Sequence, residues 1–172
     1  LSAGQRELVL GEAAYLRQLA DQMDEQITKG QLTEAAKIGR RYLSVSSNPG
    51  RCSGIKLKLA AVSARSGSTE EALRLYREVA HHGRAHDMER QNAFAFMARL
   101  QNRTGQRDEA LATWRLLLRN YPRGLHEREA LRELVRATCG IDDQESRSLR
   151  SRLAERSRDD RNIEQLLHRC TP

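Results

Sequence analysis

Apolar residues recur along this chain at the three- and four-residue spacing of α-helices, in paired segments separated by a glycine. The clearest pair flanks Gly105. Before this glycine, one helical face carries a mostly apolar stripe: Phe94, Met97, Ala98 and Gln101. After it, a second stripe predicts a helix over about 107–120 with Pro122 as its stop, and its members are Ala110, Trp114 and Leu117. The pattern predicts two antiparallel helices with Gly105 in the turn between them.

This hairpin pattern repeats along the chain. Three glycines stand 37 and 38 residues apart, and each is followed five residues later by alanine, as Gly30 and Ala35, Gly67 and Ala72, Gly105 and Ala110. A self-similar unit at a nearly fixed period of this size is typical of stacked-repeat architectures. We therefore expect an all-α protein in which residues 1–172 form a single solenoid of antiparallel helix pairs. The expected repeats cover about 15–49, 52–86 and 88–123, and a degenerate fourth repeat with C-terminal capping helices covers 125–172.

Local signals add expectations for individual helix ends. The stretch 3–28 fits either one long helix or two helices with a break at Gly11. Ser68 and Glu71 have the spacing of a capping box, in which the two side chains satisfy each other's free backbone amides. The last segments are highly charged, as the outer face of a terminal cap requires, because no further repeat covers it.

Composition fits a helix-rich protein and limits the function classes. Among 172 residues, 38% are hydrophobic, 4% are aromatic and 31% are charged. No apolar stretch approaches the roughly 20 residues of a membrane-spanning helix, and the N-terminus lacks the apolar segment of a signal peptide. Because the first residue is Leu1 rather than methionine, we expect a processed form or a piece of a longer protein.

The chain is basic, with a net charge of +7 and with 26 arginines against 4 lysines. The positive excess is spread along the sequence, without a basic tail or a run of adjacent cations. Binding sites for nucleic acid usually cluster their positive charge. We therefore favour a mildly basic, solvated surface over a footprint for nucleic acid or acidic lipid.

Three cysteines permit one intramolecular disulfide and leave at least one thiol over. Cys139 closes a predicted helix and Cys170 follows the last one, so a disulfide between them is geometrically reasonable and would fix the C-terminus. Reduced, buried thiols are the alternative, and we expect Cys52 to be buried. A disulfide would indicate an oxidising compartment, which in a bacterium is the periplasm or the outer surface.

No motif predicts catalysis or a cofactor. His81, His82 and His86 gather after the second repeat, but Gly83 interrupts the helix that would align them, and no carboxylate or cysteine stands at ligand spacing. The sequence also lacks a phosphate-binding loop, a dinucleotide-binding glycine motif and a nucleophile elbow. We expect no enzyme active site, no metal and no cofactor.

The repeated residues resemble the tetratricopeptide repeat. That family has a small residue late in its first helix, glycine at the turn, alanine five residues later, then an aromatic, a small or apolar residue and a proline. The third repeat matches at Ala98, Gly105, Ala110, Trp114, Leu117 and Pro122. The second matches at Ala60, Gly67, Ala72, Tyr76 and Val79, with Arg84 in place of the proline. The first matches at Gly30 and Ala35 but has Gly39 at the aromatic position and Tyr42 at the small one.

The resemblance covers roughly residues 15–140 and implies a right-handed α-solenoid, although the period is 37–38 residues rather than 34. Related helical-hairpin arrays with looser periods are the alternative. The resemblance also implies a concave groove, lined by the first helix of each pair, that holds an extended peptide or a partner helix. By position, the groove candidates are Lys58, Arg65, Asn92, Phe96, Arg99, Asn102 and Arg103, with Arg17, Asp21 and Asp24 from the first repeat.

A subset of the family clamps a C-terminal carboxylate, but its residues are not reproduced here. Alanine occupies several of the positions concerned: Ala20, Ala61 and Ala95. We therefore expect a different ligand. Arginines at Arg65, Arg99 and Arg103 favour acidic or carboxylate-bearing partners through charge-assisted hydrogen bonds.

These observations lead to two functional hypotheses. The first is a non-enzymatic scaffold or adaptor that binds a partner segment in the groove, within a bacterial envelope assembly. For this hypothesis we favour the periplasm or the outer membrane over the cytoplasm, and a protein or peptide partner over nucleic acid. The alternative is a regulatory or sensor domain of a larger signalling or transcriptional protein.

Overall fold

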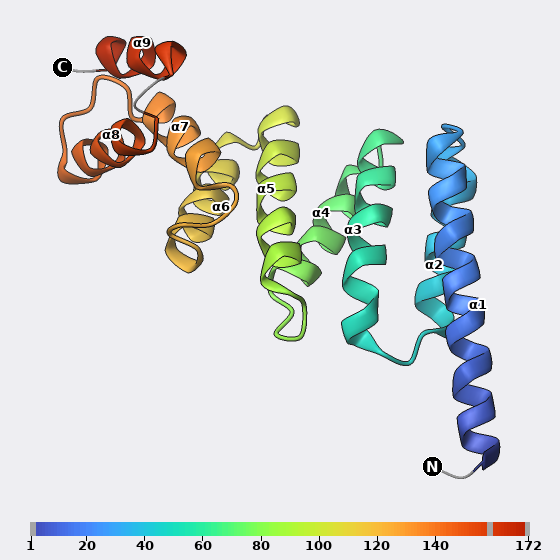
Figure 1. Ribbon diagram of the computed structural model, residues 1–172. Coiled ribbons are helices and arrows are strands. Elements are labelled where there is room, and N and C mark those ends of the chain that lie inside the picture. The colour runs from blue at the N-terminus through green and yellow to red at the C-terminus, as the bar shows by residue number, and fades with distance from the viewer. Residues whose placement is uncertain (1–2, 158–159, 171–172) are drawn as a thin grey trace. The chain divides into compact units, whose positions relative to one another are not determined.

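The computed structural model describes the backbone of residues 3–157 and 160–170, and every regular element in these residues is an α-helix (Figure 1). The chain divides into two compact units, Leu1–Ala93 and Phe94–Pro172. The first contains α1 (Ala3–Thr28), α2 (Leu32–Val45), α3 (Pro49–Arg65), α4 (Thr69–Ala80) and the start of α5 (Asp87–Arg103). The second contains the rest of α5, α6 (Arg107–Asn120), α7 (Glu127–Ala137), α8 (Gln144–Arg156) and α9 (Arg161–Arg169). The expected all-α class is therefore confirmed.

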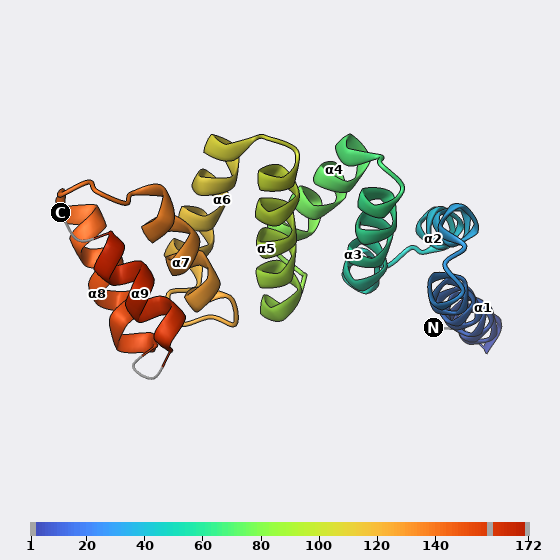
Figure 2. The same cartoon turned by 90° about the horizontal axis from the view of Figure 1, so that it is seen from above.

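In the first unit, α1 packs against α2, α2 against α3 and α3 against α4 (Figures 1 and 2). Side-chain ion pairs also join α1 to α3 and α2 to α4. Lys58 of α3 donates to Asp24 of α1 with an Nζ–Oδ2 distance of 2.6 Å. Arg40 of α2 donates through Nε and Nη2 to the two carboxylate oxygens of Glu71 in α4, at 3.0 and 2.8 Å. The first helices of the two hairpins are thus neighbours, and so are the second helices.

The second unit follows the same scheme. Arg99 of α5 donates to Glu129 of α7 with an Nε–Oε1 distance of 2.7 Å. Arg115 of α6 donates to Glu145 of α8, again at 2.7 Å between Nε and Oε1. Within each unit, the packing of consecutive and alternate helices is consistent with the stacked hairpins of a helical solenoid.

The three repeated glycines end the first helix of each hairpin with the same backbone geometry. Gly30, Gly67 and Gly105 have φ angles of +73°, +83° and +81°, in the left-handed region that glycine adopts without steric cost. The residue after each glycine donates its N–H to the carbonyl oxygen five residues back, at 2.8–2.9 Å: Gln31 to Gln26, Ser68 to Ser63 and Gln106 to Gln101. This bond is part of the Schellman motif that terminates helices. The sequence period therefore reports a repeated turn.

Buried residues in the second helix of each hairpin explain the rest of the repeat. The alanines five residues after the glycines are buried, and so are the aromatic residues four further on: Ala35, Ala72, Ala110, Tyr76 and Trp114. In the first hairpin, Gly39 takes the place of the aromatic because Met23 of α1 fills the space. A β-carbon on Gly39 would lie 3.0 Å from the Met23 Cε atom and 3.3 Å from a methyl group of Leu59.

Two expectations about helix ends are now decided. The stretch from Ala3 to Thr28 is one helix, without a break at Gly11. The capping box is wrong, because the Ser68 side chain makes no capping hydrogen bond. Glu71 instead accepts from Arg40 and from the hydroxyl of Ser63, at 2.9 Å, and these contacts link three helices.

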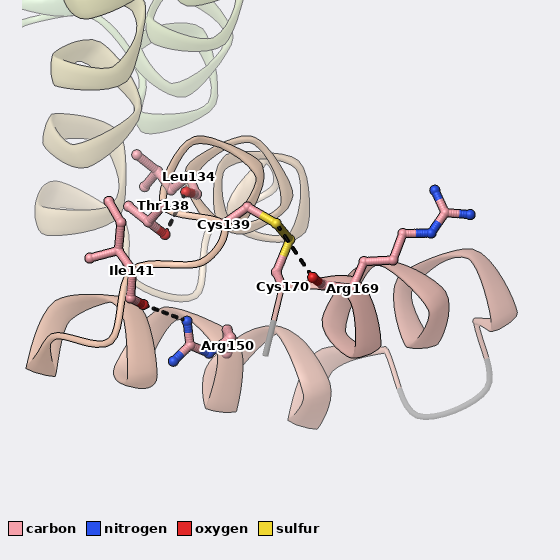
Figure 3. Close-up of a disulfide and its surroundings, with 7 residues drawn as sticks. All are labelled: Leu134, Thr138, Cys139, Ile141, Arg150, Arg169 and Cys170. Atoms are coloured by element: carbon pink, nitrogen blue, oxygen red, sulfur yellow. Dashed lines mark hydrogen bonds between the residues drawn. A yellow bond between two sulfur atoms is a disulfide. The ribbon is translucent and has the colours of Figure 1, made fainter. Parts of the chain in front are cut away.

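The last helix, α9, is attached to α7 and α8 at several points. Cys139, just after α7, forms a disulfide with Cys170 at the end of α9, with the sulfur atoms 2.10 Å apart (Figure 3). This is the pair of cysteines that the sequence singles out. Arg128 of α7 pairs with Asp160 at the start of α9, and Ile163 of α9 is buried. Cys52 is a free, buried thiol on α3.

Candidate functional site

In the first unit, the groove candidates lie on the first helices of the hairpins. Arg17 and Asp21 of α1 and Arg65 of α3 are exposed, while Asn92, in the part of α5 that belongs to this unit, is half-buried. Two further candidates bind each other, since Lys58 and Asp24 form the ion pair that joins α3 to α1. The charge of Lys58 is therefore compensated within the chain.

In the second unit, α5 and α7 place four side chains in a compact cluster. The guanidinium carbon of Arg99 lies 5.4 Å from the ring centroid of Phe96, one turn earlier on α5, in a cation–π geometry. The ring of Phe96 meets the imidazole of His126 edge to face, with 6.5 Å between the centroids. Glu129 of α7 accepts two hydrogen bonds from Arg99 and lies 3.6 Å from Nδ1 of His126. Aromatic, cationic and anionic groups thus share one patch.

The carboxylate of Glu129 is strongly held in its charged form. Burial alone would raise its pKa, but the interactions with His126 and Arg99 outweigh burial and lower the pKa to about 2. The Glu129 side chain is only 22% exposed, whereas that of Arg99 is 46% exposed. The pair is therefore ionised throughout the physiological range and is accessible mainly from the arginine side.

A cavity of about 260 Å³ adjoins the end of α5 in the second unit. Its lining combines apolar walls with charged rims and consists of Asn102, Arg107, Ala110, Leu111, Trp114, Glu133, Arg136 and Ala137. Among these, Arg136 and Glu133 pair along α7 at 3.0 Å. The last groove candidate, Arg103, is exposed in the same turn of α5.

Two contacts and a shared cavity place α5 beside α7 over about two helical turns. Phe96 meets His126 and Arg99 meets Glu129, which are both 30 positions apart, and Asn102 shares its cavity with Glu133 one turn further along. We call this surface, formed by Phe96, Arg99, Asn102, Arg103, His126, Glu129 and Glu133, the α5–α7 face.

The sequence did not single out His126 or Glu129, although Gly140 gave a weak signal for the end of the helix that begins just after His126. Gly140 stands 35 positions after Gly105 and has the same left-handed backbone, with φ of +78°. However, Glu145 rather than alanine stands five residues after it, so the motif fades in this repeat. The position of α7 beside α5 depends on packing that no local pattern encodes.

The described residues offer no group of three or more histidine, cysteine or acidic side chains close enough to hold a metal ion. In the same part of the chain, no helix has the length and apolar character needed to cross a membrane. No protein-family model matches the chain, and no curated protein matches it either.

Proposed function

We propose that the chain is a non-enzymatic, tetratricopeptide-like interaction module that holds a segment of a partner protein against the α5–α7 face. The observation that carries this proposal is the parallel alignment of α5 and α7, which brings Phe96, Arg99 and His126 together beside the cavity at Asn102. Aromatic and arginine side chains are enriched at the centres of protein interfaces. A rigid helical face of this kind suits an extended peptide or a helix.

The ion pairs change the expected chemistry of the partner. Because Glu129 already binds the guanidinium of Arg99, an acidic residue of the partner would have to compete with Glu129 for Arg99. Arg103 lies in the last turn of α5 with its side chain exposed, where a carboxylate of the partner can reach it. We propose that the partner places an apolar or aromatic residue near Phe96 and an acidic residue near Arg103.

We also propose that the protein acts in an oxidising compartment, as a component of a bacterial envelope assembly. The disulfide between Cys139 and Cys170 supports this part of the proposal, because reducing compartments rarely maintain such bonds. A mass measurement of the protein isolated without reductant tests it. A mass two hydrogens below that of the fully reduced chain supports the proposal, and three free thiols would contradict it.

Site-specific photo-crosslinking tests the partner surface in cells that produce the protein. A benzophenone amino acid is placed at Asn102 or Arg103, and at Ala154 as a control, since Ala154 is exposed on α8. We expect the same partner protein to be captured from both α5 positions and not from Ala154. Equal capture from all three positions, or capture from Ala154 alone, would contradict the assignment.

The affinity for the captured partner then tests the charge contribution. Arg99→Ala and Arg103→Ala are compared with wild type at two salt concentrations, and Arg17→Ala in the first unit serves as a matched exposed arginine. We expect Arg103→Ala to weaken binding by about tenfold at low salt and less at high salt, as for a charge-assisted hydrogen bond. Unchanged affinity in both α5 variants at both concentrations would overturn the proposal.

A further inference from the structure

A second cleft lies in the second unit, between α6 and α8, and shares none of its lining residues with the α5–α7 face. Its volume is about 280 Å³. Residues of α6 and α8 line most of it, and α7 contributes Leu134. The lining residues are Arg115, Leu118, Arg119, Leu134, Glu145, Ser148, Leu149 and Arg152. We call it the α6–α8 cleft.

The base of the α6–α8 cleft is apolar. Leu118 of α6 and Leu149 of α8 each keep 6% of their surface exposed and Leu134 of α7 keeps none, so the apolar area that the cleft offers is small. A branched or aromatic side chain that entered the cleft would find an apolar surface there, and its transfer from water would contribute roughly 25 cal/mol for each Å² buried.

The rim of the cleft is positive, and two of its three arginines are already committed within the chain. Arg115 pairs with Glu145 at 2.7 Å. Arg152 pairs with the buried carboxylate of Glu127 at 3.0 Å. Arg119 is exposed, and none of the side chains described, those of residues 11–48, 52–157 and 160–170, makes a hydrogen bond or ion pair to its guanidinium.

An adjoining cavity of about 220 Å³ extends the positive surface along α8. It shares Arg152 with the α6–α8 cleft, and its other lining residues are Pro122, Arg123, Glu127, Glu155 and Arg156. Together the two cavities are lined by five arginines and three glutamates, an excess of two positive charges. Arg123, like Arg119, is exposed and has no recorded partner in the described part of the chain.

We propose that the α6–α8 cleft is a second binding site, which takes a peptide segment with an apolar side chain flanked by carboxylates. The apolar side chain occupies the leucine-lined base, and the carboxylates meet Arg119 and Arg123, whose forked guanidinium groups suit bidentate contact with carboxylate oxygens. The site does not depend on the partner surface proposed above.

The lining favours such a peptide over nucleic acid. Single-stranded nucleic acid is commonly held by aromatic side chains on which the bases stack, together with a basic track for the phosphates. None of the described residues that line the α6–α8 cleft or its neighbour is aromatic, and the base consists of leucines. A phosphate backbone would leave this apolar surface unused.

The experiment uses the full chain and a fluorescein-labelled decapeptide of alternating glutamate and leucine. A second peptide replaces every glutamate with glutamine, a third replaces every leucine with serine, and a decathymidine oligonucleotide represents phosphate ligands. Fluorescence anisotropy gives each affinity, and amide chemical shifts of the ¹⁵N-labelled protein locate the contact. We expect the Glu/Leu peptide to bind at least tenfold more tightly than each of the other three probes, with shifts concentrated in α6 and α8.

Two variants separate this site from general charge attraction. In Arg119→Gln/Arg123→Gln, two exposed side chains without recorded partners are changed, so the fold should be retained, as circular dichroism would verify. We expect the double variant to bind the Glu/Leu peptide at least tenfold more weakly, which is the scale of a lost charge-assisted hydrogen bond. Arg107 also lies on α6 but lines the cavity beside Asn102, so the Arg107→Gln protein should bind the Glu/Leu peptide like wild type.

Several results would overturn the inference. These are equal binding of the Glu/Leu and Gln/Leu peptides, an unchanged affinity in the double variant, and shifts confined to residues outside α6 and α8. Tighter binding of the oligonucleotide at the same residues would also overturn it and would assign the cleft to phosphate ligands. Because Arg119 and Arg123 are not part of the α5–α7 face, an unchanged affinity in the double variant leaves the proposed function to its own test.

Discussion

The terminal methyl group of Met23 lies 3.0 Å from the position that a β-carbon on Gly39 would occupy. In the other two hairpins, the equivalent second-helix position carries the buried aromatic residues Tyr76 and Trp114. Met23 is fully buried. In the first hairpin, this side chain of α1 fills the space that Tyr76 and Trp114 fill from the second helix of the other two hairpins.

Restoring the aromatic residue of the repeat should therefore destabilise the first hairpin. We expect Gly39→Tyr to lower the free energy of unfolding by about 2 kcal/mol, because overpacking typically costs 1–3 kcal/mol. In Met23→Ala/Gly39→Tyr the loss should be smaller than the sum of the two single variants. Urea unfolding of all four proteins measures this coupling, and strictly additive losses would show that the two residues do not share one space.

The repeated turns predict a different response at Gly67 and at Gly83. Gly67 has φ of +83°, a conformation in which any side chain is strained, whereas Gly83 is exposed, lies outside that region and has open space around its α-carbon. We expect Gly67→Ala to cost about 1 kcal/mol, and Gly83→Ala to be neutral or slightly stabilising. Thermal unfolding compares them, and similar values would argue against the repeated left-handed turn.

Turn geometry and helix periodicity were largely readable from the sequence, because both depend on neighbouring residues. The helix expected over 107–120 coincides with α6, and the three periodic glycines all occupy the same turn. What the sequence did not yield are contacts between distant segments. Neither Met23 beside Gly39 nor Glu129 beside Arg99 follows from local spacing, since both require knowing which helices are neighbours. Glu71 failed as a capping residue for the same reason, because Arg40 of another helix binds it.

The ion pair between Arg99 and Glu129 predicts a specific dependence of stability on pH. The pKa of Glu129 in the folded protein is about 2, below the 4.5 that is usual for glutamate. Its contribution to the free energy of unfolding is therefore complete above the pKa of the unfolded state and is lost as the pH falls toward 2. We expect Glu129→Gln to cost about 1–2 kcal/mol at pH 7, because its hydrogen bonds from Arg99 are charge-assisted but Arg99 is half-exposed and partly screened by solvent.

Urea unfolding of wild type and Glu129→Gln between pH 7 and pH 2 measures this contribution. The difference between the two proteins should be constant down to about pH 5 and should then shrink as the carboxylate becomes protonated. Arg40→Gln, which breaks the ion pair with Glu71 in the first unit, provides a comparison outside the α5–α7 face. A Glu129→Gln difference that is unchanged at pH 2 would contradict the assigned pKa.

The disulfide should govern how firmly α9 is held. The bond joins residues 31 positions apart, and a loop of this length corresponds to about 3.7 kcal/mol in the chain-entropy treatment. We expect Cys139→Ala/Cys170→Ala to lose about this much stability and to exchange the amide hydrogens of α9 faster, while those of α2 are unaffected. Reductant should reproduce the effect in wild type and change nothing in the double variant. Slow exchange in α9 without the disulfide would show that its other contacts suffice.

The central claim is that the α5–α7 face holds a partner segment. Hydrogen–deuterium exchange of the full chain, with and without the partner recovered by crosslinking, tests this claim most directly, because it surveys all described helices at once. We predict that protection upon binding is concentrated in residues 96–103 and 126–136, and that at low salt and a partner concentration near the wild-type Kd it is reduced in Arg103→Ala. Protection confined to α1–α4, or protection in α5 and α7 that Arg103→Ala does not alter, would contradict the account.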